Sequence, residues 1–210
     1  MKTLPAVAAA VFLAACAHQP PAASRAISTF TPATEQIPSK GALERFYHVS
    51  RSVDSTTRDS VSEVVVQANF RSARVWCSNL DGPPTRLSIS LARHSNPMAG
   101  TGVLLAVEYE ASEGLLVSGE RSLRFRLNGA ELQPAQAGDP VRREHFSRSE
   151  TMHYLISTTE LKRIVDADTA SVHLQGRAGQ CDSPLTGHAR GLIALFLERE
   201  LADLVIAEKR

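Results

Sequence analysis

The chain has 210 residues, with 23 lysines and arginines against 22 aspartates and glutamates, so its formal net charge is +1. A nearly neutral chain argues against a nucleic-acid partner, because nucleic-acid binding needs a basic face that displaces counterions. Aromatic residues make up only 5% of the sequence, which also argues against a surface on which sugars or single-stranded bases stack.

The N-terminal residues predict an export signal. Lys2 supplies a positive charge, and the apolar run 4–13 follows it. This run is far shorter than the ~20 residues that a helix needs to cross a bilayer, so its length and flanks fit a cleaved signal peptide. The run ends in Leu-Ala-Ala-Cys at positions 13–16, where small residues suit the extended backbone that a peptidase must hold.

The motif at positions 13–16 resembles the lipobox of bacterial lipoproteins. The resemblance covers only this N-terminal stretch. It implies that residues 1–15 are removed as a signal peptide, that the thiol of Cys16 is diacylated, and that the new amino terminus is acylated. Because Ala17 rather than Asp follows the cysteine, the resemblance also implies anchoring in the outer membrane, with the domain facing the periplasm. The alternative is an ordinary signal peptide that contains a cysteine.

Residues 16–40 are predicted to be the lipidated cysteine and a flexible tether. Prolines interrupt this stretch among Ala, Ser, Thr and Gln residues. Such a composition cannot bury enough apolar surface to offset the entropy of ordering the chain. Residues 41–210 remain for a single periplasmic domain, which is long enough to bury a substantial core.

The first two-thirds of this domain has the apolar alternation of β-strands. Alternating or short apolar runs occur at residues 47–53, 64–70, 73–77, 86–91, 103–110 and 123–127. The first two runs are predicted to form a hairpin around a turn at 54–59. Asn128-Gly129 predicts a second hairpin, because both residues tolerate the positive φ of a type I′ turn. Several runs have one polar face, as strands of antiparallel sheets do.

The last third of the chain changes to helical periodicity. Ser157 and Glu160 have capping-box spacing at the start of a short helix. This helix lies between strands at 153–156 and 170–174, and the three elements are predicted to form one right-handed β-α-β crossover. An apolar stripe predicts a final helix over 187–208.

The sequence therefore predicts an α+β fold. Its main element is a mostly antiparallel sheet of about seven to nine strands, with a short helix and a long C-terminal helix packed on one face. The final helix is expected to cover the sheet, because an amphipathic stripe is usually part of the core. The alternative is that this helix binds a partner.

Two cysteines, Cys77 and Cys181, lie in the predicted domain. Exported proteins enter a compartment in which disulfides persist, and the two residues are too far apart for a redox C-x-x-C motif. A disulfide between them is predicted, and it would tie the start of the sheet to the base of the final helix. The alternative is two separate buried thiols.

Catalytic, cofactor and metal sites are expected to be absent. The sequence has no G-x-S-x-G elbow for a nucleophilic serine, and Gly-Thr-Gly at 100–102 lacks the lysine and helix of a phosphate loop. Glu144, His145 and His153 come nearest to a metal cluster, but no Cys or Asp accompanies them at ligand spacing. A solvated strand face accounts for the acidic cluster Glu108, Glu110 and Glu113.

Basic residues concentrate in two stretches of the domain. They define a candidate basic patch of Arg124, Arg126, Arg142, Arg143 and Arg148. Such a patch fits anionic lipid headgroups, lipopolysaccharide phosphates or an acidic protein. The alternative is a solvated surface that neighbouring acidic residues neutralise.

Together these patterns predict a lipid-anchored envelope lipoprotein whose domain is a non-catalytic binding or accessory module. Its expected partners are the membrane, through the N-terminal lipid, and an envelope protein; no nucleic acid is expected. Two alternatives stay open. One is a lipid-anchored hydrolase that acts on a cell-envelope substrate, and the other is a subunit of a larger envelope machine, docked through the last helix.

Overall fold

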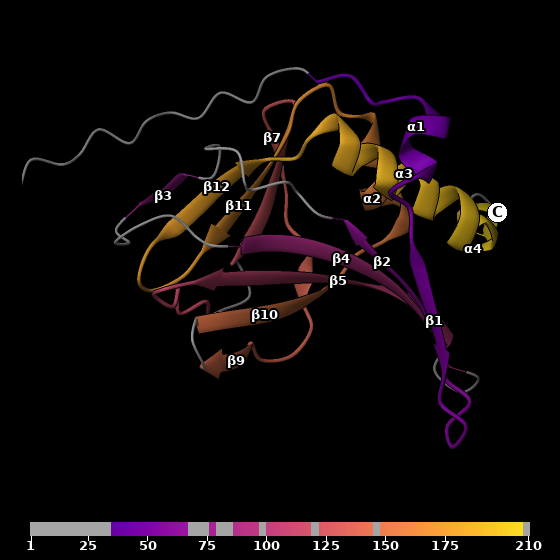
Figure 1. Cartoon of the computed structure of the whole chain (residues 1–210), viewed down its shortest axis with the longest axis horizontal. Helices are drawn as coiled ribbons and strands as arrows, with labels where there is room; N and C mark the ends of the chain where they lie inside the picture. Colours follow the sequence, from indigo (N-terminus) through magenta and orange to yellow (C-terminus); the bar gives the residue numbers. More distant parts are fainter. Residues whose placement is uncertain are drawn as a thin grey trace, which may run out of the picture.

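A computed structural model describes residues 35–66, 76–78, 86–96, 100–118, 122–144 and 148–207. The predicted signal peptide, Cys16 and most of the predicted tether lie outside these described residues. Within them, the chain forms two antiparallel sheets, with helices gathered at one end (Figure 1). The α+β fold class and its mostly antiparallel sheet structure are confirmed, although the strands are divided between two sheets.

The large sheet contains seven strands in the order β1-β2-β4-β5-β10-β8, with β9 also paired to β10. Its strands are β1 Val49–Val53, β2 Ser60–Val66, β4 Arg86–Asn96, β5 Gly100–Ala111, β8 Ala135–Gln136, β9 Val141–Glu144 and β10 Arg148–Leu155. The first predicted hairpin is confirmed, because β1 and β2 pair antiparallel from Val49↔Val64 to Val53↔Ser60. The long strands β4 and β5 form the centre of the sheet.

The small sheet contains five strands in the order β3-β12-β11-β6-β7. Its strands are β3 Trp76–Ser78, β6 Leu123–Leu127, β7 Ala130–Leu132, β11 Ala170–Gln175 and β12 Gln180–Pro184. The second predicted hairpin is confirmed, because β6 and β7 pair around Asn128 and Gly129. The φ angles of these two residues, 48° and 85°, are both positive, as a type I′ turn requires.

The helices gather at one end of the two sheets (Figure 1). They are α1 Lys40–Glu44, α2 Thr158–Asp166, α3 Gly187–Glu200 and α4 Ala202–Ala207. The predicted capping box begins α2: the Oγ of Ser157 accepts from the N–H of Glu160 at 3.1 Å, and the Glu160 carboxylate accepts from the N–H of Ser157 at 2.8 Å. The predicted final helix is interrupted at Leu201, whose φ of −123° lies outside the helical range.

The predicted β-α-β crossover is wrong. β10 belongs to the large sheet, whereas β11, which follows α2, belongs to the small sheet and pairs antiparallel with β6 and β12. Helix α2 therefore connects two sheets instead of two parallel strands of one sheet. In this position it buries Leu161 and Ile164 in the core.

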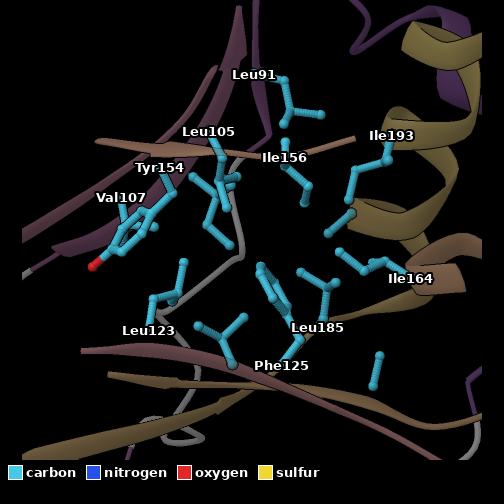
Figure 2. Packing of buried hydrophobic residues seen from close by; sticks show 14 of the residues in the cluster. Leu91, Leu105, Val107, Leu123, Phe125, Tyr154, Ile156, Ile164, Leu185 and Ile193 are labelled. Carbon is cyan, nitrogen blue, oxygen red and sulfur yellow. The ribbon is translucent and has the colours of Figure 1, made fainter. Parts of the chain in front are cut away.

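The core lies between the two sheets and continues to the helices (Figure 2). The side chains that converge there come from the large sheet (Leu91, Leu105, Val107 and Tyr154), from the small sheet (Leu123 and Phe125), and from α2 and α3 (Ile164 and Ile193). One hydrogen bond joins the two sides inside the core, because the Tyr154 hydroxyl lies 2.7 Å from the Oγ of Ser122. Burial raises the pKa of Tyr154, and the Ser122 hydrogen bond lowers it by less, so the phenol stays neutral.

Cys77 on β3 and Cys181 on β12 form a disulfide. The two residues are direct partners in the antiparallel pair β3–β12, and their Cα atoms are 4.1 Å apart. This distance is close to the ~4.5 Å of a non-hydrogen-bonded cross-strand pair, in which opposite side chains approach each other. The predicted bridge is therefore present, and it ties the edge strand β3 to the strand that leads into α3.

Candidate functional site

The loop that follows β5, described over residues 112–118, has an unusual backbone conformation. Leu116 has a φ of 55°, in the left-handed region that residues other than glycine rarely adopt, and its side chain is 45% exposed. Such a conformation costs on the order of 1–3 kcal/mol and persists only where surrounding contacts hold it. Because strained residues concentrate at functional sites, this loop is the candidate site.

Glu150, on β10, holds the loop in place. Its two carboxylate oxygens accept hydrogen bonds from the backbone N–H groups of Leu116 and Val117, each at 2.7 Å. Consecutive N–H groups around a left-handed residue form a concave anion-binding site, which is called a nest. The chain fills this nest with a carboxylate of its own, and Glu150 is only 2% exposed.

Arg142, on the neighbouring strand β9, contacts both the carboxylate and the loop. Its Nε lies 3.6 Å from Oε2 of Glu150, and its guanidinium donates to the carbonyl of Val117 at 2.7 Å. The arginine therefore offsets the buried negative charge and binds the loop backbone. The carboxylate also affects β5: burial, and then the charges of Glu150 and Glu113, raise the pKa of Tyr109 to about 12, so this phenol stays neutral.

The turn between β11 and β12 also packs against the loop. The N–H groups of Arg177 and Ala178 donate to the carbonyls of Leu116 and Leu115, at 3.1 and 3.2 Å. A side chain at Gly176 would not fit, because a Cβ there would lie 2.0 Å from the carbonyl oxygen of Leu115. Elements of both sheets therefore fix the position of the loop.

The exposed part of the site combines one apolar side chain with basic ones. Leu116 is the apolar centre, and the side chains of Arg142, Arg148 and Arg177 are exposed around the loop. Arg148 lies beside the loop at Gly114, where an added Cβ would be 3.7 Å from the arginine's Cδ. We call Leu116 and these three arginines the loop surface.

The structure divides the predicted basic patch between two sheets. Arg142 and Arg148 belong to the loop surface, and Arg143 is exposed on β9 directly after Arg142. Arg124 and Arg126 lie on β6 of the small sheet, where both approach one carboxylate. Part of the patch is therefore brought together around the loop, and the other part is not.

Sequence reasoning missed three important members of the site. Leu116 and Arg177 lie in loops, where no periodicity marks a residue as special. The sequence does contain a signal for Glu150. Alternate residues of a strand lie on the same face, so Glu150 shares a face with Met152 and Tyr154, which are both fully buried. An acidic residue at an inward-facing strand position predicts a buried carboxylate that needs hydrogen-bond donors.

A second polar arrangement crosses the outer face of the small sheet. Arg124 lies 3.7 Å from Glu131 and is the cross-strand neighbour of His173, whose Nδ1 lies 2.8 Å from Oδ1 of Asp182. A histidine paired with an aspartate is part of a hydrolase triad, in which Nε2 takes the proton of the nucleophile. Here Nε2 of His173 is buried and has no hydrogen-bond partner among the described residues. In this arrangement the ring does not present Nε2 to a substrate.

The candidate metal cluster of Glu144, His145 and His153 lies partly outside the described part of the chain, which includes neither His145 nor the side chain of Glu144. His153 lies on β10 and is half-buried. In the part of the chain that the structure describes, no three His, Cys, Asp or Glu side chains gather closely enough to hold a metal ion. In the acidic cluster, Glu108 accepts a hydrogen bond from Ser88 at 3.3 Å, which fits a structural role on the sheet.

No protein-family model, curated protein or solved structure matches this chain. Among the helices of the described ranges, none combines the length and the apolar character that a membrane span requires. The loop surface and the N-terminal motif are therefore the features from which function is inferred.

Proposed function

We propose that this chain is a lipoprotein of the outer membrane, anchored by lipid on Cys16, and that its periplasmic domain is a non-catalytic binding or accessory module. The observation that carries the proposal is the Leu-Ala-Ala-Cys motif at positions 13–16, at the end of the apolar run of an export signal. The Cys77–Cys181 disulfide supports export, because disulfides persist in oxidising compartments such as the periplasm.

The domain binds its partner through the loop surface. An exposed leucine on a fixed backbone loses little conformational entropy when it enters an apolar pocket of a partner. The arginines around it suit acidic side chains at the rim of such a pocket, and these charges direct the approach of the two proteins. The partner is therefore an envelope protein with an apolar pocket bordered by Asp or Glu residues.

A lipid-anchored hydrolase is the second candidate, and the His173–Asp182 pair is the observation that favours it. Hydrolysis by this pair requires a nucleophile within hydrogen-bond distance of the ring and a rearrangement that exposes Nε2. The loop surface requires no rearrangement before it meets a partner. Binding is therefore the better supported function.

Replacing Cys16 with serine tests the anchor. The variant is expected to lose all metabolic labelling with an alkyne fatty acid, because the acylated thiol is gone, and to move from the membrane fraction to the soluble periplasm. Cys77→Ser is the matched control and should keep both the label and the membrane association. A Cys16→Ser protein that still carries label and sediments with membranes would contradict the proposal.

A further inference from the structure

The first described residues are fixed to the start of α3. The carboxylate of Glu35 accepts a hydrogen bond from the N–H of Gly187 at 3.0 Å, and the buried guanidinium of Arg190 donates to the backbone carbonyl of Glu35. Arg190 also donates to the carbonyl of Ala167, just after α2. Only glycine fits at position 187, because a Cβ there would lie 2.2 Å from the carbonyl oxygen of Gln36. The point at which the chain enters the domain is therefore a fixed part of the fold.

This entry point is the part of the domain to which the proposed anchor is tethered. Residues 17–34 separate Cys16 from Glu35. A chain of this length reaches about 65 Å at most when it is fully extended. The surface around Glu35 is therefore the part of the domain whose distance from the bilayer is most closely limited.

Two apolar side chains are exposed beside the entry point. Ile37 is 40% exposed and Phe46 is 60% exposed. Both belong to the segment that packs on α3: Ile37 approaches Gly191 together with Leu43, and the ring of Phe46 meets the ring of His188 edge-on, with centroids 5.0 Å apart. We call Ile37 and Phe46 the entry surface.

Basic side chains accompany the entry surface. Arg45 and His48 are exposed close to Phe46 in the chain, and neither forms an ion pair with any residue in the described ranges. Lys40, by contrast, is paired with Glu198 at 2.6 Å. Apolar side chains beside a cation such as Arg45 suit an anionic membrane surface, where the apolar groups enter the boundary of the acyl chains and the cation meets the phosphates.

We propose that the entry surface contacts the lipid bilayer and sets the orientation of the domain on it. This inference rests on the proposed lipid anchor, which keeps the bilayer within reach of Glu35. At about 25 cal/mol for each Å² of apolar area, two partly exposed side chains cannot hold a protein on a membrane alone. The anchor supplies the affinity, and the entry surface selects the face that meets the lipid.

The proposed orientation has a consequence for the loop surface. Helix α1 lies between Ile37 and Phe46 in the chain, and strand β9 carries Arg142 of the loop surface. Figure 1 shows α1 and β9 at opposite ends of the molecule. With the entry surface on the bilayer, the loop surface points toward the periplasm. The domain would then present its binding site to a partner instead of to its own membrane.

The test uses the full lipidated chain in vesicles of phosphatidylethanolamine and phosphatidylglycerol that contain brominated acyl chains. Phe46→Trp places a fluorophore on the entry surface. Val141→Trp is the matched control, because Val141 is also an exposed apolar residue but lies on β9. The tryptophan emission of the unchanged chain comes from Trp76, and it is subtracted from the emission of each variant. We expect brominated lipid to quench the added emission of Phe46→Trp about twofold or more, and that of Val141→Trp not measurably.

Equal quenching of the two added tryptophans would overturn the inference. So would an unquenched Phe46→Trp in protein that floats with the vesicles, a result that points to a protein cover for the entry surface. Failure of the proposed function is distinguishable, because a chain without lipid does not float with the vesicles at all. Ile37→Trp repeats the measurement at the second position, so a local folding fault at Phe46 does not decide the outcome.

Discussion

Replacing Cys77 and Cys181 together with alanine is expected to lower the free energy of unfolding by up to about 4.7 kcal/mol, the chain-entropy value for a loop of about 100 residues. The two cysteines are 104 residues apart in the sequence. The bridge acts mainly by restricting the unfolded chain. The expected loss is a large share of the roughly 5–15 kcal/mol by which a domain is usually stable. Urea unfolding followed by circular dichroism measures it.

Reduction provides the control for this double variant. Dithiothreitol should lower the urea midpoint of the unchanged protein toward that of the variant, and it should leave the variant unaffected. The edge strand β3 should lose order first, because it has three residues and pairs only with β12 in the described sheet. Identical midpoints with and without reductant in the unchanged protein would show that the bridge does not stabilise the fold.

Glu150→Ala is expected to destabilise the protein by roughly 2–6 kcal/mol, because two N–H groups lose their acceptor and each loss is worth about 1–3 kcal/mol when the group is buried. These are the N–H groups of Leu116 and Val117. Arg142 also loses its carboxylate partner. Glu150→Gln keeps the shape but offers only one acceptor oxygen, so it is expected to cost about 1–3 kcal/mol.

Glu131→Gln is the matched control for the buried carboxylate. Glu131 is an exposed glutamate that also approaches arginines, and surface pairs of this kind contribute about 0–1 kcal/mol. Hydrogen exchange separates the two roles. The N–H groups of Leu116 and Val117 should exchange faster in Glu150→Gln and at the original rate in Glu131→Gln. If they stay protected in Glu150→Gln, then Glu150 does not hold the loop.

The local features of the fold could be predicted from sequence because they depend on residues close together in the chain. Leu87, Ile89 and Leu91 alternate with polar residues, and all three are buried on β4. The turn at Asn128 and the cap at Ser157 follow from the backbone preferences and hydrogen bonds of a few adjacent residues. Each of these predictions needs no information about the rest of the fold, and the structure confirms each of them.

The assignment of strands to sheets could not be predicted in the same way. Alternation shows which side of a strand is buried, but it does not show which strand lies beside it. The strands before and after α2 were expected to pair in one sheet, whereas the chain passes from the large sheet to the small one. The disulfide did carry long-range information, because Cys77 and Cys181 place β3 beside β12.

The candidate site depends on the same long-range contacts. An isolated bridge between Val117 and Gly176 brings Arg177 to the loop, and no local pattern connects these two segments. The five predicted arginines come from two stretches that were expected to lie on neighbouring strands, although Arg124 and Arg126 belong to a different sheet from the others. The clustering of arginines along the sequence identified the residue type that surrounds the site, and the tertiary structure determined which arginines belong to it.

Photocrosslinking in cells tests most directly whether a lipid-anchored domain binds a partner through the loop surface. A photoreactive phenylalanine derivative replaces Leu116 in the lipidated protein, and in the matched control it replaces Leu155, another exposed leucine, on β10. We predict one discrete adduct with an envelope protein from position 116, weaker when Arg177 is replaced with serine, and none from position 155. Equal adducts from the two positions, or none from position 116 in membrane-bound protein with an intact disulfide, would contradict binding through this surface.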